Sequence, residues 1–233
     1  MTFLSKLKQP YKTILLVAGI LIVLHSVLAK TGILTIYKSP TIANEPAIKS
    51  NTYFVASNLP KIKKGDIICF NHNDQLLGKH KRVYRLVAKG NDTVEIIDGI
   101  LFVNSKNFDQ NLVLKHLYAL RRDETKKLLK EKIIKNSNLM MFEDNEFLIS
   151  LSDDLAKENG FSNKLKLKPK NEANKSIMRL YGKQWNIDHF GPLTIPQGKY
   201  FVMGDNRPNA EDSRYIGFID EADVLGKVVF ILD

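Results

Sequence analysis

The sequence has few of the residues that build covalent or metal-centred sites. It contains one cysteine, Cys69, so no intramolecular disulfide can form and no cysteine metal cluster exists. The five histidines are scattered and form no HExxH or comparable pair, so we predict no metal site and no cofactor. Cys69 lies in the alternating run 66–70 and is expected to be a small buried hydrophobe rather than a nucleophile.

Motifs for nucleic-acid binding are also lacking, although the chain carries a formal charge of +10. No helix-turn-helix, zinc or aromatic-rich RNA-binding motif accompanies that charge. Many of the lysines fall between 115 and 183, in stretches typical of solvated helix faces and loops. We therefore predict no nucleic-acid partner. Hydrophobic residues make up 44% and charged residues 26%, which is typical of a globular protein.

One long apolar run stands near the N-terminus. Residues 13–29 read TILLVAGILIVLHSVLA, with His25 as the one ionisable residue. As a helix this run would be about 26 Å long, slightly short of a hydrocarbon core of about 30 Å. Continuing to Ile36 supplies the missing length, so residues 13–36 are predicted to be a transmembrane anchor.

The flanking charges predict the orientation of that anchor. Lys6, Lys8 and Lys12 precede the run, and only Lys30 closely follows it. The positive-inside bias puts residues 1–12 in the cytoplasm and the remainder outside the cell membrane. A cleavable signal peptide is the alternative, because residues 27–29 (Val-Leu-Ala) resemble a cleavage site. Both readings place the rest of the chain outside the cytoplasm.

Short alternating or apolar runs predict β structure on both sides of a central segment. Asp98-Gly99 separates two of these runs and is a strong signal for a two-residue hairpin. The runs are 53–55, 66–70, 81–88, 93–97, 100–103, 200–203 and 225–232.

The segment 112–181 has a different pattern. Residues 122–135 have the spacing of an amphipathic helix, 146–151 favours a strand, and 152–158 reads as a short helix capped by Ser152. The predicted fold is therefore mainly antiparallel β. Its core comprises 37–111 and 182–233, and 112–181 is an inserted α/β subdomain.

The segment 203–217 reads MGDNRPNAEDSRYIG and concentrates charge directly after an apolar run. Its aspartates and arginines can form charge-assisted pairs that fix the loop, and its glycines permit backbone conformations closed to other residues. A structural clamp is the favoured interpretation of these residues alone. The residues expected to form this motif are Gly204, Asp205, Asn206, Arg207, Asp212 and Arg214.

This string resembles the GDNR…DSRYxG motif of type I signal peptidases. Three weaker stretches agree in order: Gly65-Asp66-Ile67, the run 92–104 (DTVEI…DG…VN), and 185–196 (WNIDHFGPLTIP). The resemblance covers almost the whole chain, although the insertion matches only in placement. It implies the family's antiparallel β fold and its activity, the cleavage of signal peptides from exported precursors.

The resemblance also implies a Ser nucleophile and a Lys base. The nucleophile's motif, S-M-x-P-T-[LI], corresponds here to 43–48, where Ala43 stands at the serine position. A methyl group cannot attack a carbonyl. Ser39 would serve only after a register shift that breaks the Glu-Pro match, and Ser50 fits less well still.

The base position is ambiguous. Aligned without a gap, Tyr84 stands where the family has lysine, and with a three-residue insertion Lys81-Arg82-Val83 matches instead. A phenol with an ordinary pKa near ~10 cannot accept the serine's proton at neutral pH. Ser213 matches the family serine that orients the lysine. The alternative is that its hydroxyl only satisfies the local backbone of a turn.

Three functions follow from these alternatives. The chain could be a working endopeptidase with Ser39, Lys81 and Ser213 as its catalytic residues, or an impaired copy that binds exported proteins. It could also be a structural partner of an active signal peptidase. The sequence favours an impaired or inactive copy. The implied partners are secretory precursors and membrane lipid, and the sequence indicates no oligomeric state.

Overall fold

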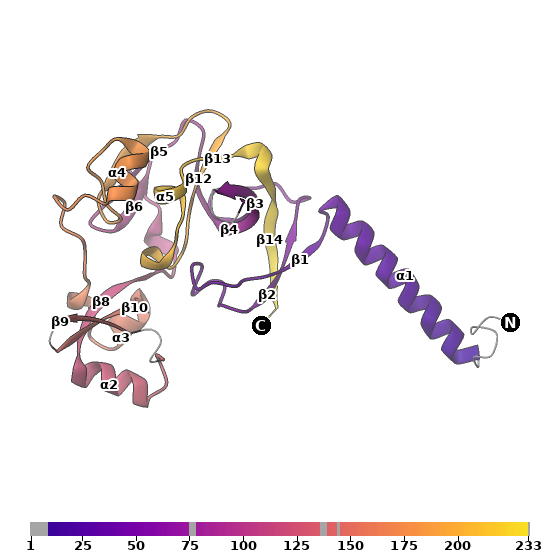
Figure 1. Cartoon of the computed structure of the whole chain (residues 1–233), viewed down its shortest axis with the longest axis horizontal. Coiled ribbons are helices and arrows are strands. Elements are labelled where there is room, and N and C mark those ends of the chain that lie inside the picture. Colours follow the sequence, from indigo (N-terminus) through magenta and orange to yellow (C-terminus); the bar gives the residue numbers. More distant parts are fainter. Residues whose placement is uncertain (1–8, 75–77, 136–138, 144, 233) are drawn as a thin grey trace.

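A single long helix precedes a β-rich body. The computed structural model describes residues 9–74, 78–135, 139–143 and 145–232 (Figure 1). Helix α1 (Gln9–Thr31) projects away from the body. It begins four residues before the predicted anchor and ends well before Ile36, since Gly32 has a φ of +73° and Thr35 opens strand β1 (Thr35–Lys38). Most of the predicted N-terminal segment 1–12 lies outside the described residues.

Helix α1 is long and apolar enough to cross a membrane. Its span Gln9–Leu28 has a mean hydropathy of 2.0, and none of it is buried by the rest of the chain. Large apolar side chains such as Leu16 and Ile22 are more than half exposed. A helix that is apolar all round, with no protein packed against it, is typical of a membrane span.

The main sheet has seven antiparallel strands. In spatial order these are β1, β2 (Tyr53–Ser57), β14 (Val224–Leu232), β3 (Ile67–Asp74), β4 (Gly78–Lys89), β12 (Lys199–Met203) and β13 (Ile219–Asp220). The runs predicted at 53–55, 66–70, 81–88, 200–203 and 225–232 are confirmed as strands of this sheet. Its C-terminal strand β14 lies between β2 and β3, so segments from both ends of the chain close one sheet.

A second sheet holds β11 (Phe190–Thr194), β5 (Thr93–Ile97), β6 (Ile100–Val103) and β7 (Lys106–Asn107). The predicted hairpin is confirmed, because Ile97 pairs with Ile100 across Asp98-Gly99. Both turn residues have positive φ, +50° and +79°, as a type I′ turn requires. The mainly β, antiparallel fold class is therefore correct.

The predicted insertion carries its own sheet and hydrophobic cluster. Strands β8 (Lys115–Arg121), β10 (Glu146–Ser152) and β9 (Leu139–Glu143) form the sheet. Helices α2 (Arg122–Lys130) and α3 (Asp153–Glu158) pack beside it. The cap of α3 is as predicted, with the Ser152 hydroxyl accepting from the Leu155 amide at 3.4 Å.

Two boundaries differ from the sequence expectation. Helix α2 ends at Lys130 rather than 135. Helix α4 (Lys175–Tyr181) packs Ile177 into the cluster beside the second sheet, together with Phe190 and Phe201. The insertion's own cluster therefore extends only to about Phe161. Cys69 is buried in the main sheet, as predicted.

Candidate functional site

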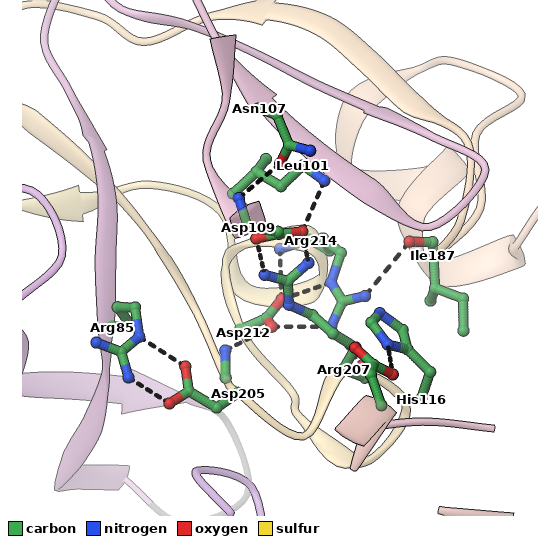
Figure 2. A network of polar contacts seen from close by, with 12 residues as sticks. Arg85, Leu101, Asn107, Asp109, His116, Ile187, Asp205, Arg207, Asp212 and Arg214 are labelled. Carbon is green, nitrogen blue, oxygen red and sulfur yellow. Dashed lines mark hydrogen bonds and ion pairs between the residues drawn. The ribbon is translucent and has the colours of Figure 1, made fainter. Parts of the chain in front are cut away.

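The loop 204–214 follows β12 and is held by three aspartate–arginine pairs (Figure 2). Asp205, 2% exposed, accepts both from Arg85 Nε at 2.7 Å and from the same guanidinium's terminal nitrogen. Asp109 likewise accepts a bidentate pair of hydrogen bonds, from the two terminal nitrogens of Arg207. From the sequence, we predicted that the aspartates and arginines of the loop pair with one another. The structure corrects this for Asp205 and Arg207, whose partners come from β4 and from the short helix η2 (Asp109–Asn111).

The third pair lies wholly inside the loop and is almost completely buried. Asp212 accepts from Arg214 Nε and its terminal nitrogen, each at 2.9 Å. Arg214 also donates to the Arg207 carbonyl at 2.6 Å, and Asp212 accepts from the Gly204 amide at 3.0 Å. The pKa of Arg214 is raised: burial opposes its charged form, but the Asp212 carboxylate outweighs that effect. This pair fixes the loop's path.

Asn206 joins the loop to the segment that carries Ala43. Its amide donates to the Ala43 carbonyl at 3.0 Å, and its Nδ2 donates to the Ile42 carbonyl at 3.1 Å. Its Oδ1 accepts from Ser150 of the insertion at 2.8 Å. The motif predicted Asn206 as a structural residue. Only the fold shows that it connects three separate parts of the chain.

A groove of about 340 Å³ opens beside these elements. Ala43 lies in it, 4% exposed, and packs with Tyr84 and Val202 in one hydrophobic cluster. A Cβ atom on Gly204 would lie 2.6 Å from the Ala43 carbonyl oxygen and 3.4 Å from a Tyr84 ring carbon. The groove is lined by Pro40, Thr41, Ala43, His80, Lys81, Arg82, Val83, Tyr84, Asn209 and Glu211.

Tyr84 is a proton donor in this setting. Burial, followed by the nearby Asp212 carboxylate, raises the pKa of the Tyr84 phenol to about 12, and the Arg82 guanidinium only partly opposes that. A phenol with that pKa keeps its proton throughout the physiological range. Its hydroxyl can donate a hydrogen bond, but it cannot act as a general base at neutral pH.

Ser213 is completely buried and is not among the residues that line the groove. Its hydroxyl accepts from the Val202 amide of β12 at 2.9 Å, and its carbonyl accepts from the Tyr181 hydroxyl at 2.5 Å. Val202 belongs to the same cluster as Tyr84. Ser213 is therefore held against β12, next to the cluster that contains Tyr84.

Ser39 and Lys81 occupy different environments. Ser39 is completely buried, and its hydroxyl donates to the Thr41 carbonyl at 3.3 Å. Lys81 is exposed at the rim of the groove. In the described part of the chain, no hydrogen bond joins these two side chains. Ser50 lies away from the groove and beside another cavity.

Two charged residues of the groove had no assigned role in the sequence interpretation. Arg82 donates to the Glu211 carbonyl at 2.9 Å and to its carboxylate at 3.0 Å, linking β4 to the loop 204–214. Arg82 Nε also donates to His80 at 2.9 Å. Side chains alternate along a strand, so residues 80, 82 and 84 of β4 share one face, and this pattern could have placed Arg82 beside Tyr84. No pattern in the sequence pairs Arg82 with the distant Glu211.

One edge of β4 is exposed along the groove. β12 ends at Met203 opposite Arg85, while β3 follows β4 as far as Gly78. Within the described residues, no strand pairs with 78–84 on the β12 side. Asn44 covers one point of this edge by donating to the Val83 carbonyl at 2.7 Å. An extended polypeptide could add to such an edge.

Nowhere in the described chain do three His, Cys, Asp or Glu side chains converge to hold a metal ion.

Comparisons with known proteins agree with these features. The family model described as "Signal peptidase, peptidase S26" matches residues 10–232. A signal peptidase I of Buchnera aphidicola is 33% identical over 78% of this chain, and the match spans 58% of that relative's length. A signal peptidase I of Aquifex aeolicus is 25% identical over 91% of this chain and 80% of its own.

A solved structure gives a weaker likeness. The crystal structure of a signal peptidase I from Enterococcus faecalis is 24% identical, covers 74% of this chain and 100% of its own, and has a TM-score of 0.35. The family match extends from the start of α1 to the end of β14, so it takes in all three sheets and the loop 204–214. The chain therefore belongs to the signal peptidase family, peptidase S26.

Proposed function

We propose that this chain is a membrane-anchored, signal peptidase-like protein that binds segments of exported precursors in the groove and cleaves them poorly or not at all. One observation carries the proposal. Ala43 and Tyr84 belong to one buried cluster beside Gly204, at the positions where the resemblance puts the family's serine and, aligned without a gap, its lysine. The family's name states its activity, the removal of signal peptides.

The chemistry of these two side chains supports an impaired copy. Serine attack needs a hydroxyl and a base that takes its proton. Ala43 provides no hydroxyl, and a Tyr84 phenol with a pKa of about 12 provides no base. Losing either member of such a unit removes most of the rate. The absence of both is expected to leave cleavage at background.

Ser39 and Lys81 are the rival catalytic pair, and their environments argue against it. The Ser39 hydroxyl is buried and donates to the Thr41 carbonyl. Lys81 is exposed at the rim of the groove, and among the described residues no hydrogen bond joins it to Ser39. We propose that Ser213 acts as a structural hydroxyl, because it accepts from the Val202 amide.

The binding mode follows from the exposed edge of β4. An extended segment can pair with residues 78–84 and direct alternate side chains into the groove. The groove is small, and the nearly buried Ala43 and Tyr84 are among its lining residues. Segments with small side chains are therefore the expected ligands.

Membrane attachment completes the proposal. We propose that α1 anchors the chain in the cell membrane, with the N-terminus in the cytoplasm and the β-rich body outside. The support is the apolar span of α1 and the excess of lysine before it. Membrane lipid is then a partner of α1, and exported precursors reach the groove on the outer side.

The test uses the full chain in detergent with a secretory precursor and a fluorescent peptide that matches its signal-peptide end. We expect binding of the peptide, measured by anisotropy, and no cleavage of the precursor. Thr41→Trp fills the groove from an exposed position and should abolish binding, whereas Lys61→Trp, on a remote exposed site, should not. Cleavage by the unaltered chain that disappears in Ser39→Ala would refute the proposal.

A further inference from the structure

A second cavity lies where the β core meets the insertion; we name it the junction cavity. Its volume is about 670 Å³, within the range of ligand-binding sites. The core wall is formed by residues 42–51. The opposite wall is formed by the loop after α2, residues 132–135, and by β10. Neither the family assignment nor the groove accounts for this cavity.

The charge lining the junction cavity is predominantly positive. Lys49, Lys115, Lys132 and Lys135 line it, against a single carboxylate, Glu45. Lys115 pairs with Glu45 at 2.7 Å. Lys49 and Lys132 are exposed, and among the described residues neither side chain makes an ion pair. The exposed Lys49 and Lys132 therefore attract an anionic ligand.

The cavity also exposes apolar side chains. Ile42 is 37% exposed and Ile133 is 39% exposed, and they lie on opposite walls. Pro46 and Leu155 add apolar surface. A ligand that complements this lining carries anionic and apolar groups together. A polypeptide segment with acidic residues has that chemistry.

The junction cavity and the groove are separated by one stretch of backbone. Thr41 and Ala43 line the groove, while Ile42 between them lines the junction cavity. Asn206 holds this stretch by donating to the carbonyls of Ile42 and Ala43, and Ser150 of the cavity donates to Asn206. The groove and the junction cavity therefore adjoin across the stretch 41–43, so the junction cavity is the neighbouring site for a chain bound in the groove.

We propose that the junction cavity binds an acidic continuation of the same polypeptide whose small-residue segment occupies the groove. This inference rests on the proposed function and names a second recognition element for its ligand. Ion pairs at the exposed Lys49 and Lys132 should together tighten binding roughly fivefold. Because β4 offers a directional edge, only one end of the bound segment points toward the cavity.

The experiment compares four fluorescent peptides on the full chain in detergent. One is a segment of small residues alone. Two carry a block of glutamates at the N-terminal or the C-terminal end, and the fourth carries lysines at the end that binds better. Dissociation constants are measured at about 50 mM and about 500 mM salt, since high salt screens exposed charges.

The same peptides are measured on two variants of the chain. Lys49→Glu/Lys132→Glu is the test variant. Lys61→Glu/Lys106→Glu changes the net charge equally and touches neither cavity nor groove.

We expect glutamates at one end only to tighten binding, and we expect lysines there to weaken it. High salt and the test variant should both remove the gain, and the control variant should keep it. Equal gains at both ends, or a gain that the test variant keeps, would reveal a general effect of the +10 charge and overturn the inference. Binding of the short peptide with no acidic gain overturns this inference alone. Failure of every peptide overturns it together with the proposed function.

Discussion

Gly204 lies directly against Ala43, so that a Cβ atom at residue 204 would stand 2.6 Å from the Ala43 carbonyl oxygen. The same Cβ atom would collide with the Ala210 side chain. Gly204 has no positive φ, so close packing rather than backbone conformation requires glycine here. This contact sets how closely the loop 204–214 approaches the segment that carries Ala43, and it therefore shapes the groove.

Gly204→Ala is expected to destabilise the chain by about 2 kcal/mol or more, the usual cost of overpacking a well-filled interior. Denaturant unfolding of the purified chain measures the change. Adding Ala210→Gly removes one of the two collisions, so the double variant should recover part of the loss. An unfolding free energy unchanged by Gly204→Ala would contradict the close contact.

Restoring both reactive groups should restore cleavage. Ala43→Ser/Tyr84→Lys supplies a hydroxyl and an amine at two side chains that pack in one buried cluster, where burial lowers the pKa of a lysine. Either single variant should remain at background, because nucleophile and base act as a unit. The measurement is the release of a mature-length product from a secretory precursor. If Ala43→Ser alone gains the full rate, Tyr84 is not the residue that blocks proton transfer.

Arg214→Leu should be the most damaging single change in the loop 204–214. Arg214 is 1% exposed and neutralises Asp212, so the variant leaves a buried carboxylate without its partner, at a cost of roughly 3–5 kcal/mol. Asp212→Asn/Arg214→Leu removes the stranded charge as well and should be more stable than Arg214→Leu alone. Unfolding curves of the three proteins give this comparison. Equal stability of the single and double variants would show that the buried charge is not the cause.

Asp92 should make stability depend on pH in the acid range. Burial by itself would raise the pKa of Asp92, but the Lys89 amide, the Lys64 ammonium and the Asn104 amide outweigh it and hold the pKa below its usual value. A depressed pKa adds stability above the unfolded value, about 4, and that stability is lost as pH falls through the folded value. Asp92→Asn should therefore be less stable than the parent near pH 7, and the difference should disappear at acid pH. A difference that is constant with pH would exclude this linkage.

Several features follow from short stretches of sequence, because their causes are local. The apolar run of α1, the Asp98-Gly99 turn and the Ser152 cap each depend on neighbouring residues and on backbone dihedral preferences. All three elements are present in the structure. Hydropathy alone does not register the end of α1 at Thr31, because the break is made by the backbone of Gly32 before β1.

The sequence by itself determined the family, the mainly antiparallel β fold, and the absence of a hydroxyl at residue 43. Each depends on residue identity or on local pattern. Only the tertiary structure decided that Asp205 pairs with Arg85 and Arg207 with Asp109, that Tyr84 faces inward while Lys81 lies at the rim, and that a cationic cavity lies behind Ala43. Those outcomes depend on strand register and on contacts between residues far apart in the chain, because which charges and side chains meet is set by packing of the whole domain.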